Sequence, residues 1–556
     1  MAEKELFKAY ITPTLNTKDD DLVGIATDWF TESKKYHTEL EKVWQQNEKY
    51  YKGNQTFKER VPSDMSNTVQ NQVFMGVETV VPIITANPPQ FIAEPPTESD
   101  DSVKFAQAVQ KVLLIQYEIQ GVRTSGEMVM RHMIIYRFGC WKYFWNEETN
   151  DIGHKYVRPQ RLYFPKVTGK LPYMMEQIDI SSEEFRDVFG DEKFKKFLVD
   201  RGQEFDPNHL DDVRGIWTIW EIWTKDIVFW KYGGMIIDKR ENPNYDFSNK
   251  EKNHFLEPKL PYIIATAFRL GNEPIGETDL IQQTIPIQDT INVTTRLIIN
   301  NASKTGNAQW YIDSQVMSEE EARTKITNGP GQIVYGDGVA NPNLMRRDPP
   351  PPMPNYISEL KQMSERAFDN IFGTHSTTRG ERGQSETLGG RLLLKQADLG
   401  RIDLIVREFE RVVAELGDAN VQLMKLNYKK KRTFKVYGET GEDFVELVDS
   451  MIESGLKIIV KSGTTLPTDE LSKRKEAVEL WSMGALDPIT LFERLKFPNP
   501  EEAAQRLLAW KKGQLEMEEG AKGGVAGTGQ GTPPKGPTPT PLPSPQGEIG
   551  RASGGL

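Results

Sequence analysis

Apolar residues recur at steps of three and four along much of this chain, which predicts helices. Most of these stretches stop at glycine or proline, the residues that end helices most often. On this pattern we expect helices over residues 20–52, 66–85, 100–137, 182–200, 280–305 and 355–372. A further helix begins at Arg391 and continues for about 39 residues, or ~58 Å.

Between these helices the apolar period changes to two, which is typical of strands. The segments KYFWNEE, HKYVRP and RLYFP fall between residues 142 and 165, and more strands are expected over 216–238, with Gly233-Gly234 as a hairpin turn. After the long helix, TFKVYG and LKIIVKSGTT are predicted as strands around a short helix, FVELVDSMIES. The fold class predicted is therefore α+β, predominantly helical.

Four tryptophans crowd the strand-rich segment, at positions 217, 220, 223 and 230. Such rings can stack on nucleic-acid bases. Few of their neighbours are basic, so filling a core or a subunit interface is the favoured interpretation.

The middle of the chain predicts a helical hairpin with a small unit inserted between its helices. Residues 307–351 form strands, turns and a short helix that starts at Ser318, where acidic residues follow an N-capping hydroxyl. Prolines at 349–352 and 354 then form a stiff spacer. The returning helix carries an apolar stripe, made of Ile357, Leu360, Met363, Ala367, Phe368 and Ile371.

Residues 374–390 are rich in glycine and hydroxyl side chains, and Leu388 is their single large apolar residue. This segment cannot pack a core of its own and is expected to be a mobile loop. The tail from 521 to 556 has ten glycines and seven prolines and is expected to be disordered.

Composition narrows the possible functions. The chain has 556 residues, 69 Lys and Arg against 80 Asp and Glu, and a net charge of -11. That balance argues against a protein that coats DNA through excess cations, although it permits one that surrounds DNA without gripping it. We expect no membrane span and no secretory signal. One cysteine and six scattered histidines make a metal site unexpected.

Signatures of catalysis are missing from the sequence. There is no phosphate-binding loop G-x-x-x-x-G-K-[ST], no G-x-S-x-G and no H-E-x-x-H. Cys140 lies among aromatic residues and is expected to be a buried structural thiol rather than a nucleophile. We therefore expect a protein that is not an enzyme and needs no cofactor.

The order of these segments resembles the portal proteins of tailed bacteriophages over roughly residues 20–512. It begins with WQQNEKYYKGNQ and SNTVQNQVFMGVETVVPIITANPPQFIAEP, followed by the strand entry GCWK at residues 139–142. It continues with PIGETDLIQQTIPIQDTINVTTRLIINN, an insertion, ISELKQMSERAFDNIFG, a glycine-rich loop and the long helix. The segment from LKIIVKSGTTLPTDELSKRKEAVELWSMGALDPITLFERLKFPNP also looks like the end of such chains.

The resemblance implies a portal-like fold with named parts. These are wing 1–275, stem helix 276–306, clip 307–351, second stem helix 352–373, tunnel loop 374–390, long kinked helix 391–427, wing strands 428–466, crown 467–515 and a Gly/Pro-rich tail 516–556. The tail has no counterpart in the family.

The resemblance also implies a role: a homo-oligomeric ring of about twelve subunits at one capsid vertex. Double-stranded DNA passes through its tunnel without sequence specificity, during packaging and ejection. The implied partners are the terminase large subunit, the major capsid and scaffolding proteins, and the head-completion or tail adaptor proteins. The implied location is the virion, and the host cytoplasm during assembly. The alternative is a ring-forming tail or baseplate adaptor that does not handle DNA.

Two groups of candidate site residues follow. Arg379, Arg382, Arg391 and Lys395 are expected to contact DNA in the tunnel, with Glu381 and Glu386 keeping the contact of the loop weak. An ordinary flexible linker is the alternative for the loop.

Trp310, Tyr311, Arg346 and Arg347 are expected to dock the motor or adaptor from the clip. A small core within the inserted unit is an equally good interpretation of Trp310. The basic run Lys429–Arg432 suits the C-terminus of a helix at least as well as a DNA contact.

Overall fold

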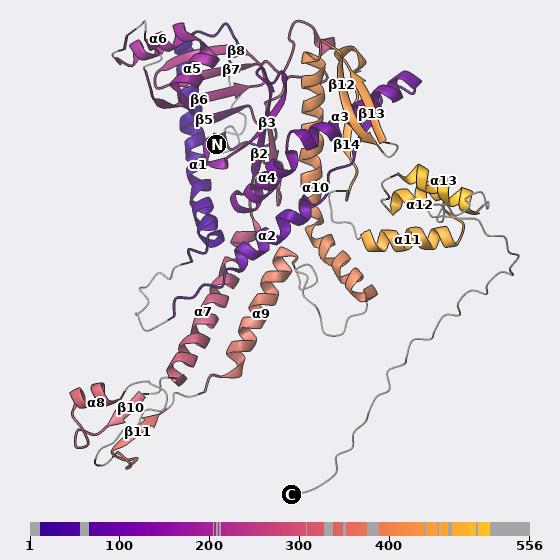
Figure 1. The fold of residues 1–556 in the computed structure, drawn as a ribbon. Helices are drawn as coiled ribbons and strands as arrows, with labels where there is room; N and C mark the ends of the chain where they lie inside the picture. Colours follow the sequence, from indigo (N-terminus) through magenta and orange to yellow (C-terminus); the bar gives the residue numbers. More distant parts are fainter. Residues whose placement is uncertain are drawn as a thin grey trace, which may run out of the picture. The chain divides into compact units, whose positions relative to one another are not determined.

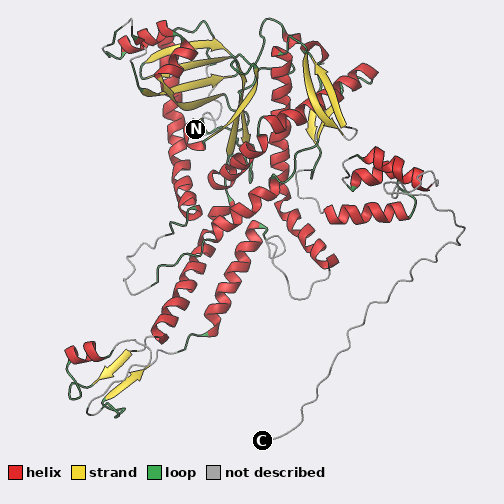
Figure 2. Ribbon diagram, viewed as in Figure 1, coloured by secondary structure: helices red, strands yellow, loops and turns green. Residues whose placement is uncertain are grey.

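The computed structural model describes residues 12–55, 66–203, 205–206, 209–210, 213–306, 309–326, 337, 339–348, 352–374, 388–438, 441–452, 455–464, 470–495, 497 and 499–511. Within these ranges helices alternate with small antiparallel sheets (Figure 2). The predicted α+β class is therefore confirmed. The chain folds into two compact units, Met1–Glu470 and Leu471–Leu556. In the described part, no helix combines the length and apolar composition that crossing a membrane would require.

Helices of the N-terminal part follow the predicted periodicity, but two of the predicted helices are each divided into two. The stretch over 20–52 is α1 (Asp19–Tyr51). The stretch over 100–137 is two helices, α3 (Asp100–Ile119) and α4 (Val122–Tyr136), because Gly121 between them adopts a left-handed φ of 61°. Gly190, at φ 86°, likewise divides α5 (Ser182–Phe189) from α6 (Asp191–Asp200).

A five-stranded antiparallel sheet contains the tryptophan-rich segment. Its order is β4 (Leu162–Tyr163), β5 (Tyr173–Ser181), β6 (Ile216–Thr224), β7 (Ile227–Tyr232) and β8 (Met235–Glu241). Trp217 and Trp223 are buried, and Trp220 and Trp230 pack against the hydrophobic clusters on the two sides of the sheet. The prediction that these rings fill a core is confirmed.

A second sheet has three strands, β3 (Asp151–Val157), β2 (Gly139–Asn146) and β9 (Tyr262–Ala265). β2 begins at Gly139, a position that only glycine fits, because a Cβ there would lie 2.0 Å from the carbonyl oxygen of Val129. Cys140, the next residue, is fully buried, and burial raises the pKa of its thiol. The prediction of a structural thiol is confirmed.

A buried ion cluster joins the two sheets. Lys142 of β2 donates to Glu176 of β5 at 2.8 Å and also pairs with Glu221 of β6. Burial alone would lower the pKa of Lys142 and raise that of Glu176. Their mutual attraction, with Lys155 3.2 Å from Glu176, reverses both shifts. Charges this deep are stable only when paired, so the cluster fixes the sheets to each other.

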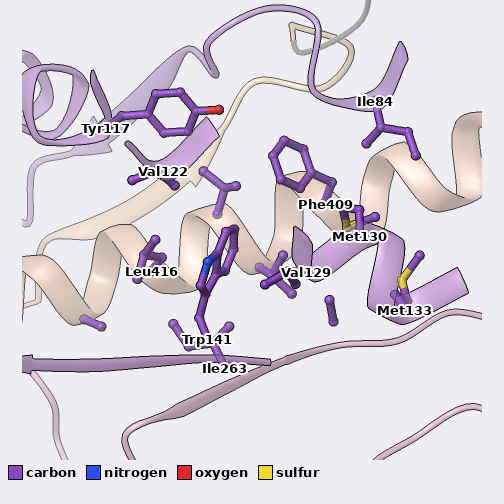
Figure 3. Packing of buried hydrophobic residues seen from close by; sticks show 14 of the residues in the cluster. Ile84, Tyr117, Val122, Val129, Met130, Met133, Trp141, Ile263, Phe409 and Leu416 are labelled. Carbon is purple, nitrogen blue, oxygen red and sulfur yellow. The ribbon is translucent and has the colours of Figure 1, made fainter. Parts of the chain in front are cut away.

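The largest hydrophobic core lies where α2 (Gln72–Ile84), α4, β2, β9 and α10 (Leu388–Asn427) meet. Figure 3 shows Trp141 of β2 between Ile263, Val129 and the side chains of α10. The Trp141 and Phe409 rings are 6.4 Å apart. The long helix predicted after the glycine-rich loop is thus anchored by burial from Ile402 onward.

Two strand pairs flank the C-terminal part of α10. β1 (Phe91–Glu94) pairs with β14 (Lys457–Val460), and β12 (Arg432–Gly438) pairs with β13 (Gly441–Leu447). The short helix predicted for FVELVDSMIES is wrong. Its first residues belong to β13, because Val445 and Leu447 turn into the core, and only a 3-10 turn (Asp449–Met451) follows.

The helical hairpin is formed by α7 (Leu280–Gly306) and α9 (Asn355–Phe372), which pack side by side (Figure 1). Between them the chain forms β10 (Gln309–Ile312), α8 (Glu319–Lys325) and β11 (Met345–Asp348). α8 starts with a capping box between Ser318 and Glu321, as predicted.

The second unit is helical within its described residues. It contains α12 (Pro488–Arg494), α13 (Pro500–Lys511) and nearly all of α11 (Glu470–Ser482). Asp487 caps α12 by accepting the backbone N–H groups of Ile489 and Thr490. The tail from 516 to 556 lies outside the described residues.

Candidate functional site

Four predicted site residues come together on one two-stranded ribbon. β10 and β11 pair antiparallel, with Trp310 opposite Arg347 and Tyr311 opposite Arg346. The guanidinium carbon of Arg347 lies 5.7 Å from the centre of the Trp310 ring, and that of Arg346 lies 5.3 Å from the Tyr311 ring. Successive strand residues face opposite sides. Each face of the ribbon therefore presents one aromatic–arginine pair.

These aromatic rings keep much of their surface exposed, 38% for Trp310 and 50% for Tyr311. The buried apolar side chains of the inserted unit include Met317 and Met345. The Trp310 side chain is therefore partly accessible to a partner. An amphipathic ring with a neighbouring cation is the kind of group that anchors protein interfaces.

The end of α9 packs into the main hydrophobic core. Phe368 and Phe372 of α9 are stacked 4.8 Å apart and buried in the main core. Gly76 of α2 leaves room for them, since a Cβ at that position would lie 2.8 Å from the Phe372 ring. Any side chain at Gly76 would push α9 away from α2.

An extended segment runs along one face of α7 and is bound to it by side chains. Helix formation was predicted over 66–85, but α2 starts only at Gln72. The backbone N–H groups of Ser66, Gln70 and Gln72 donate to the side-chain oxygens of Asn300, Asn292 and Gln288 at 2.7, 3.0 and 2.9 Å. Between them, Arg296 donates to the Thr68 carbonyl at 2.9 Å.

The spacing of these partners has a geometric cause. The four α7 residues are four apart, which is about 6.0 Å along a helix. Their partners are two apart, which is about 6.6 Å along an extended chain. The two repeats match, so each polar side chain of α7 meets the next backbone group. The sequence contained a signal for this contact, because polar residues recur every fourth position along one face of α7. These residues are Gln288, Asn292, Arg296 and Asn300, and their partner segment is the asparagine- and glutamine-rich SNTVQNQ.

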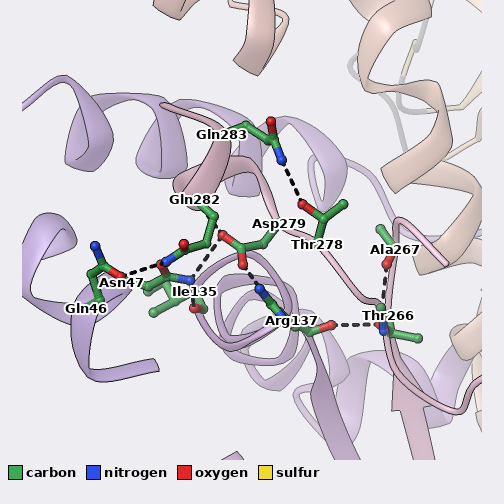
Figure 4. A network of polar contacts seen from close by, with 11 residues as sticks. Gln46, Asn47, Ile135, Arg137, Thr266, Ala267, Thr278, Asp279, Gln282 and Gln283 are labelled. Carbon is green, nitrogen blue, oxygen red and sulfur yellow. Dashed lines mark hydrogen bonds and ion pairs between the residues drawn. The ribbon is translucent and has the colours of Figure 1, made fainter. Parts of the chain in front are cut away.

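The start of α7 is held by a buried polar network, drawn in Figure 4. Asp279 accepts the backbone N–H of Gln282 at 2.7 Å and the side-chain amide of Asn47 at 3.1 Å. Its other oxygen accepts from Arg137 at 2.9 Å. Arg137 adopts a left-handed φ of 69° in the turn between α4 and β2. The helix therefore begins at Leu280, and Pro286 lies inside it rather than at its start.

The outer faces of the hairpin are apolar and exposed. On α9 the predicted stripe divides: Phe368 turns inward, while Leu360, Met363 and Ile371 are exposed, together with Tyr356. On α7 the exposed apolar residues are Val293, Leu297 and Ile299. Single exposed apolar residues are ordinary, but a contiguous stripe marks an interaction surface.

The region that contains this hairpin is similar to a known protein family. Residues 278–525 match the family described as phage P22-like portal protein. Over these residues the chain is similar to the phage portal proteins. Among solved structures, it is similar to a chain of the virion of a native gene transfer agent particle, at 12% identity and a TM-score of 0.37. That likeness covers 77% of this chain and 90% of the other, and a TM-score this low does not establish a common fold. No curated protein matches the sequence.

Within the matched residues 278–525, the structure places only some of the residues that are expected in a tunnel. Arg379 and Arg382 lie outside the described residues. Arg391 and Lys395 lie in the first turns of α10. Their contact with DNA stays a prediction.

Among the described residues, no group of three or more His, Cys, Asp or Glu side chains is arranged to hold a metal ion. His132 of α4 and His154 of β3 are largely buried, and burial lowers the pKa of each to about 4. Both imidazoles are therefore neutral at physiological pH.

Proposed function

We propose that this chain is the subunit of a portal ring at one capsid vertex of a virion, through which double-stranded DNA is packaged and later ejected. The family match over residues 278–525 supports this proposal. The structural observation that carries it is the α7–α9 hairpin, whose inner residues pack on the wing while both outer faces remain apolar and exposed.

The two exposed stripes lie on different helices of the hairpin. The stripe of α9 carries Tyr356, Leu360 and Met363, and that of α7 carries Val293 and Leu297. An interface that joins two different surfaces is heterologous and closes into a ring when the rotation between copies allows it. About twelve copies would place the hairpins around a central channel, as the portal resemblance implies.

Charge favours passage of DNA rather than tight binding. Each subunit carries a net charge of -11. Since DNA is a polyanion, such a ring repels it at long range and lets duplex slide through without strong, sequence-specific contacts. The parts named wing, stem, clip, tunnel loop and crown belong to this proposal, with Arg379, Arg382, Arg391 and Lys395 as tunnel contacts.

The ribbon of β10 and β11 is proposed as the docking surface. Its exposed rings, Trp310 and Tyr311, and the adjacent Arg346 and Arg347 suit a partner that offers apolar pockets rimmed by acidic groups. The terminase large subunit would bind there during packaging, and a head-completion or tail adaptor afterwards. Capsid and scaffolding proteins would contact other surfaces. The role is structural, with no catalytic step.

Imaging of the purified protein tests the proposal. Negative-stain class averages should show closed rings with a central hole wide enough for duplex DNA. A monomer of 63.4 kDa over a wide concentration range, even with scaffold present, would contradict it. Rings whose hole is too narrow for duplex would favour the alternative, a tail or baseplate adaptor that does not handle DNA.

A further inference from the structure

A polar hollow of about 690 Å³ lies where α10 ends and β12 begins. Asn427, the last residue of α10, and Lys429 and Lys430, which follow it, form one side. Asn150, in the turn between β2 and β3, and Thr433 and Phe434 of β12 complete it. Three residues of the basic run Lys429–Arg432 line the hollow. The proposed portal function assigns no role to this run.

The four cations of this run are not equivalent. Lys431 is paired with Glu446. Arg432 also lines the hollow, but its guanidinium stacks 4.1 Å from the Tyr428 ring, reaches Asp151 at 3.6 Å and donates to the Asn150 carbonyl at 2.5 Å. Two of the four charges are therefore already compensated by neighbouring groups.

Lys429 and Lys430 are different. Both are exposed at the hollow, and neither ammonium group has an ion pair among the residues that the structure describes. Two uncompensated positive charges thus face a concave surface that also presents two carboxamides, a hydroxyl and an aromatic ring. In a chain of net charge -11, this is a local reversal of sign.

We propose that this hollow binds a phosphate group together with the nucleoside attached to it, as one unit of a nucleic-acid strand or as a free nucleotide. Lysine binds phosphate as a point charge, and the amides and hydroxyl can donate hydrogen bonds to phosphate or sugar oxygens. The volume falls in the range of small-ligand pockets, roughly 300–1,000 Å³, and exceeds what a bare phosphate needs. Phe434 offers an aromatic face of the kind on which bases stack.

A nucleic-acid strand is the favoured source of this phosphate. The cations follow one another along the chain and the hollow opens to solvent, which suits a backbone that passes over it rather than an enclosed small molecule. The competing explanation is that Lys429 and Lys430 only complement the negative end of the α10 dipole. That explanation predicts a stability effect without phosphate binding. The proposal concerns a wing surface, and its test does not depend on ring formation.

The test compares two double variants of the full chain that remove the same charge. One is Lys429→Gln with Lys430→Gln. The matched control is Lys34→Gln with Lys35→Gln, two adjacent exposed lysines on α1 that are not among the residues lining this hollow. Binding is measured by the fluorescence anisotropy of a labelled duplex of about 20 base pairs and of a labelled single strand of equal length, at low salt. Adenosine monophosphate and inorganic phosphate are added as unlabelled competitors. Thermal unfolding confirms that both variants fold.

The hollow variant should bind the labelled strand about tenfold more weakly than the unchanged chain, and the control less than about twofold more weakly. The slope of log affinity against log salt should fall by about 1 for each lysine removed from the hollow. If adenosine monophosphate displaces the labelled strand, the ligand of the hollow is a free nucleotide. If the strands bind and adenosine monophosphate does not displace them, the ligand is a nucleic-acid strand.

Equal losses in the two double variants would overturn the proposal, because net charge alone would then explain binding. Failure of every phosphate-bearing probe to bind the unchanged chain would overturn it as well. So would a hollow variant that binds normally but melts at a lower temperature, since the lysines would then serve only the end of α10.

Discussion

The side-chain oxygen of Gln288 on α7 accepts a hydrogen bond from the backbone N–H of Gln72 at 2.9 Å, across 216 residues of sequence. The amide of the same side chain donates to the Gln70 carbonyl at 2.7 Å. One buried glutamine therefore satisfies two backbone groups at the point where the extended segment becomes α2. This contact is the first of the ladder that binds α7 to residues 66–72.

Replacement of Gln288 should therefore be costly. We expect Gln288→Ala to lower the free energy of unfolding by about 2–4 kcal/mol, since it removes two hydrogen bonds to the backbone of Gln70 and Gln72 and opens a cavity. The matched control is Gln283→Ala on the same helix, where the side chain is exposed and bonds only to Thr278. That change should cost no more than about 0.5 kcal/mol. Chemical denaturation measures both, and equal costs would mean that the ladder does not contribute.

The buried ion cluster makes a second prediction. Lys142→Met should lower the free energy of unfolding by about 3–5 kcal/mol, because Glu176 and Glu221 would remain buried without their shared cation. Lys155→Met removes a lysine from the same carboxylate, but this side chain is 46% exposed and its loss should cost under about 1 kcal/mol. The comparison is made by thermal unfolding at pH 7. A Lys142 variant as stable as the Lys155 variant would show that the sheets do not depend on the cluster.

Acid should weaken the wing through its enclosed histidines. Neither ring nitrogen of His154 has a hydrogen-bond partner in the described structure, and burial lowers its pKa to about 4. An unfolded histidine has a pKa of about 6.5. The unfolded chain therefore binds more protons between these values, so stability is complete above pH 6.5 and falls as the pH drops toward 4.

The free energy of unfolding falls between pH 7 and pH 5, and in His154→Phe this fall should be about 2 kcal/mol smaller than in the unchanged chain. At pH 7 it should be neutral or slightly stabilising, because it replaces an unpaired polar ring by an apolar one. An unaltered pH dependence in the His154 variant would contradict the prediction.

Ring assembly should depend on the outer face of α9. We expect Met363→Glu to prevent rings or to raise the concentration needed for them at least about tenfold, because a carboxylate would be buried between apolar helices. Gln362→Glu adds the same charge one residue away, also at an exposed position, and should assemble normally if the apolar stripe forms the interface. Light scattering and negative-stain images distinguish the two. Normal rings from the Met363 variant would remove the stripe from the subunit interface.

A substitution on the proposed docking surface should impair DNA packaging without preventing ring assembly. Arg346→Glu combined with Arg347→Glu should leave rings intact while lowering packaged DNA at least about tenfold, since a motor surface with acidic groups would then be repelled. The control is Arg323→Glu on α8, an exposed arginine in the same inserted unit. Packaging is measured as DNA retained in particles assembled with each variant. Unchanged packaging in the double variant would exclude these two arginines from the interface.

Several features of this protein follow from local sequence alone. The α7–α9 hairpin, the inserted unit between its helices and the start of α8 at Ser318 were all predictable, because periodicity, capping residues and prolines act over a few residues. The breaks at Gly121 and Gly190 were missed because the apolar period continues across both. The helix predicted for FVELVDSMIES was wrong because pairing with β12 outweighed helical propensity.

Sequence by itself determined the periodic helices, the strand-rich wing and the negative net charge, since these depend on composition and on neighbours along the chain. Tertiary structure alone decided which polar residues become partners: Gln288 with Gln72, Lys142 with Glu176, and Arg347 with Trp310. It also decided which half of the α9 stripe is buried and that Lys429 and Lys430 face a hollow. The physical reason is range: backbone propensities act locally, whereas hydrogen bonds, ion pairs and burial depend on segments that only folding brings together.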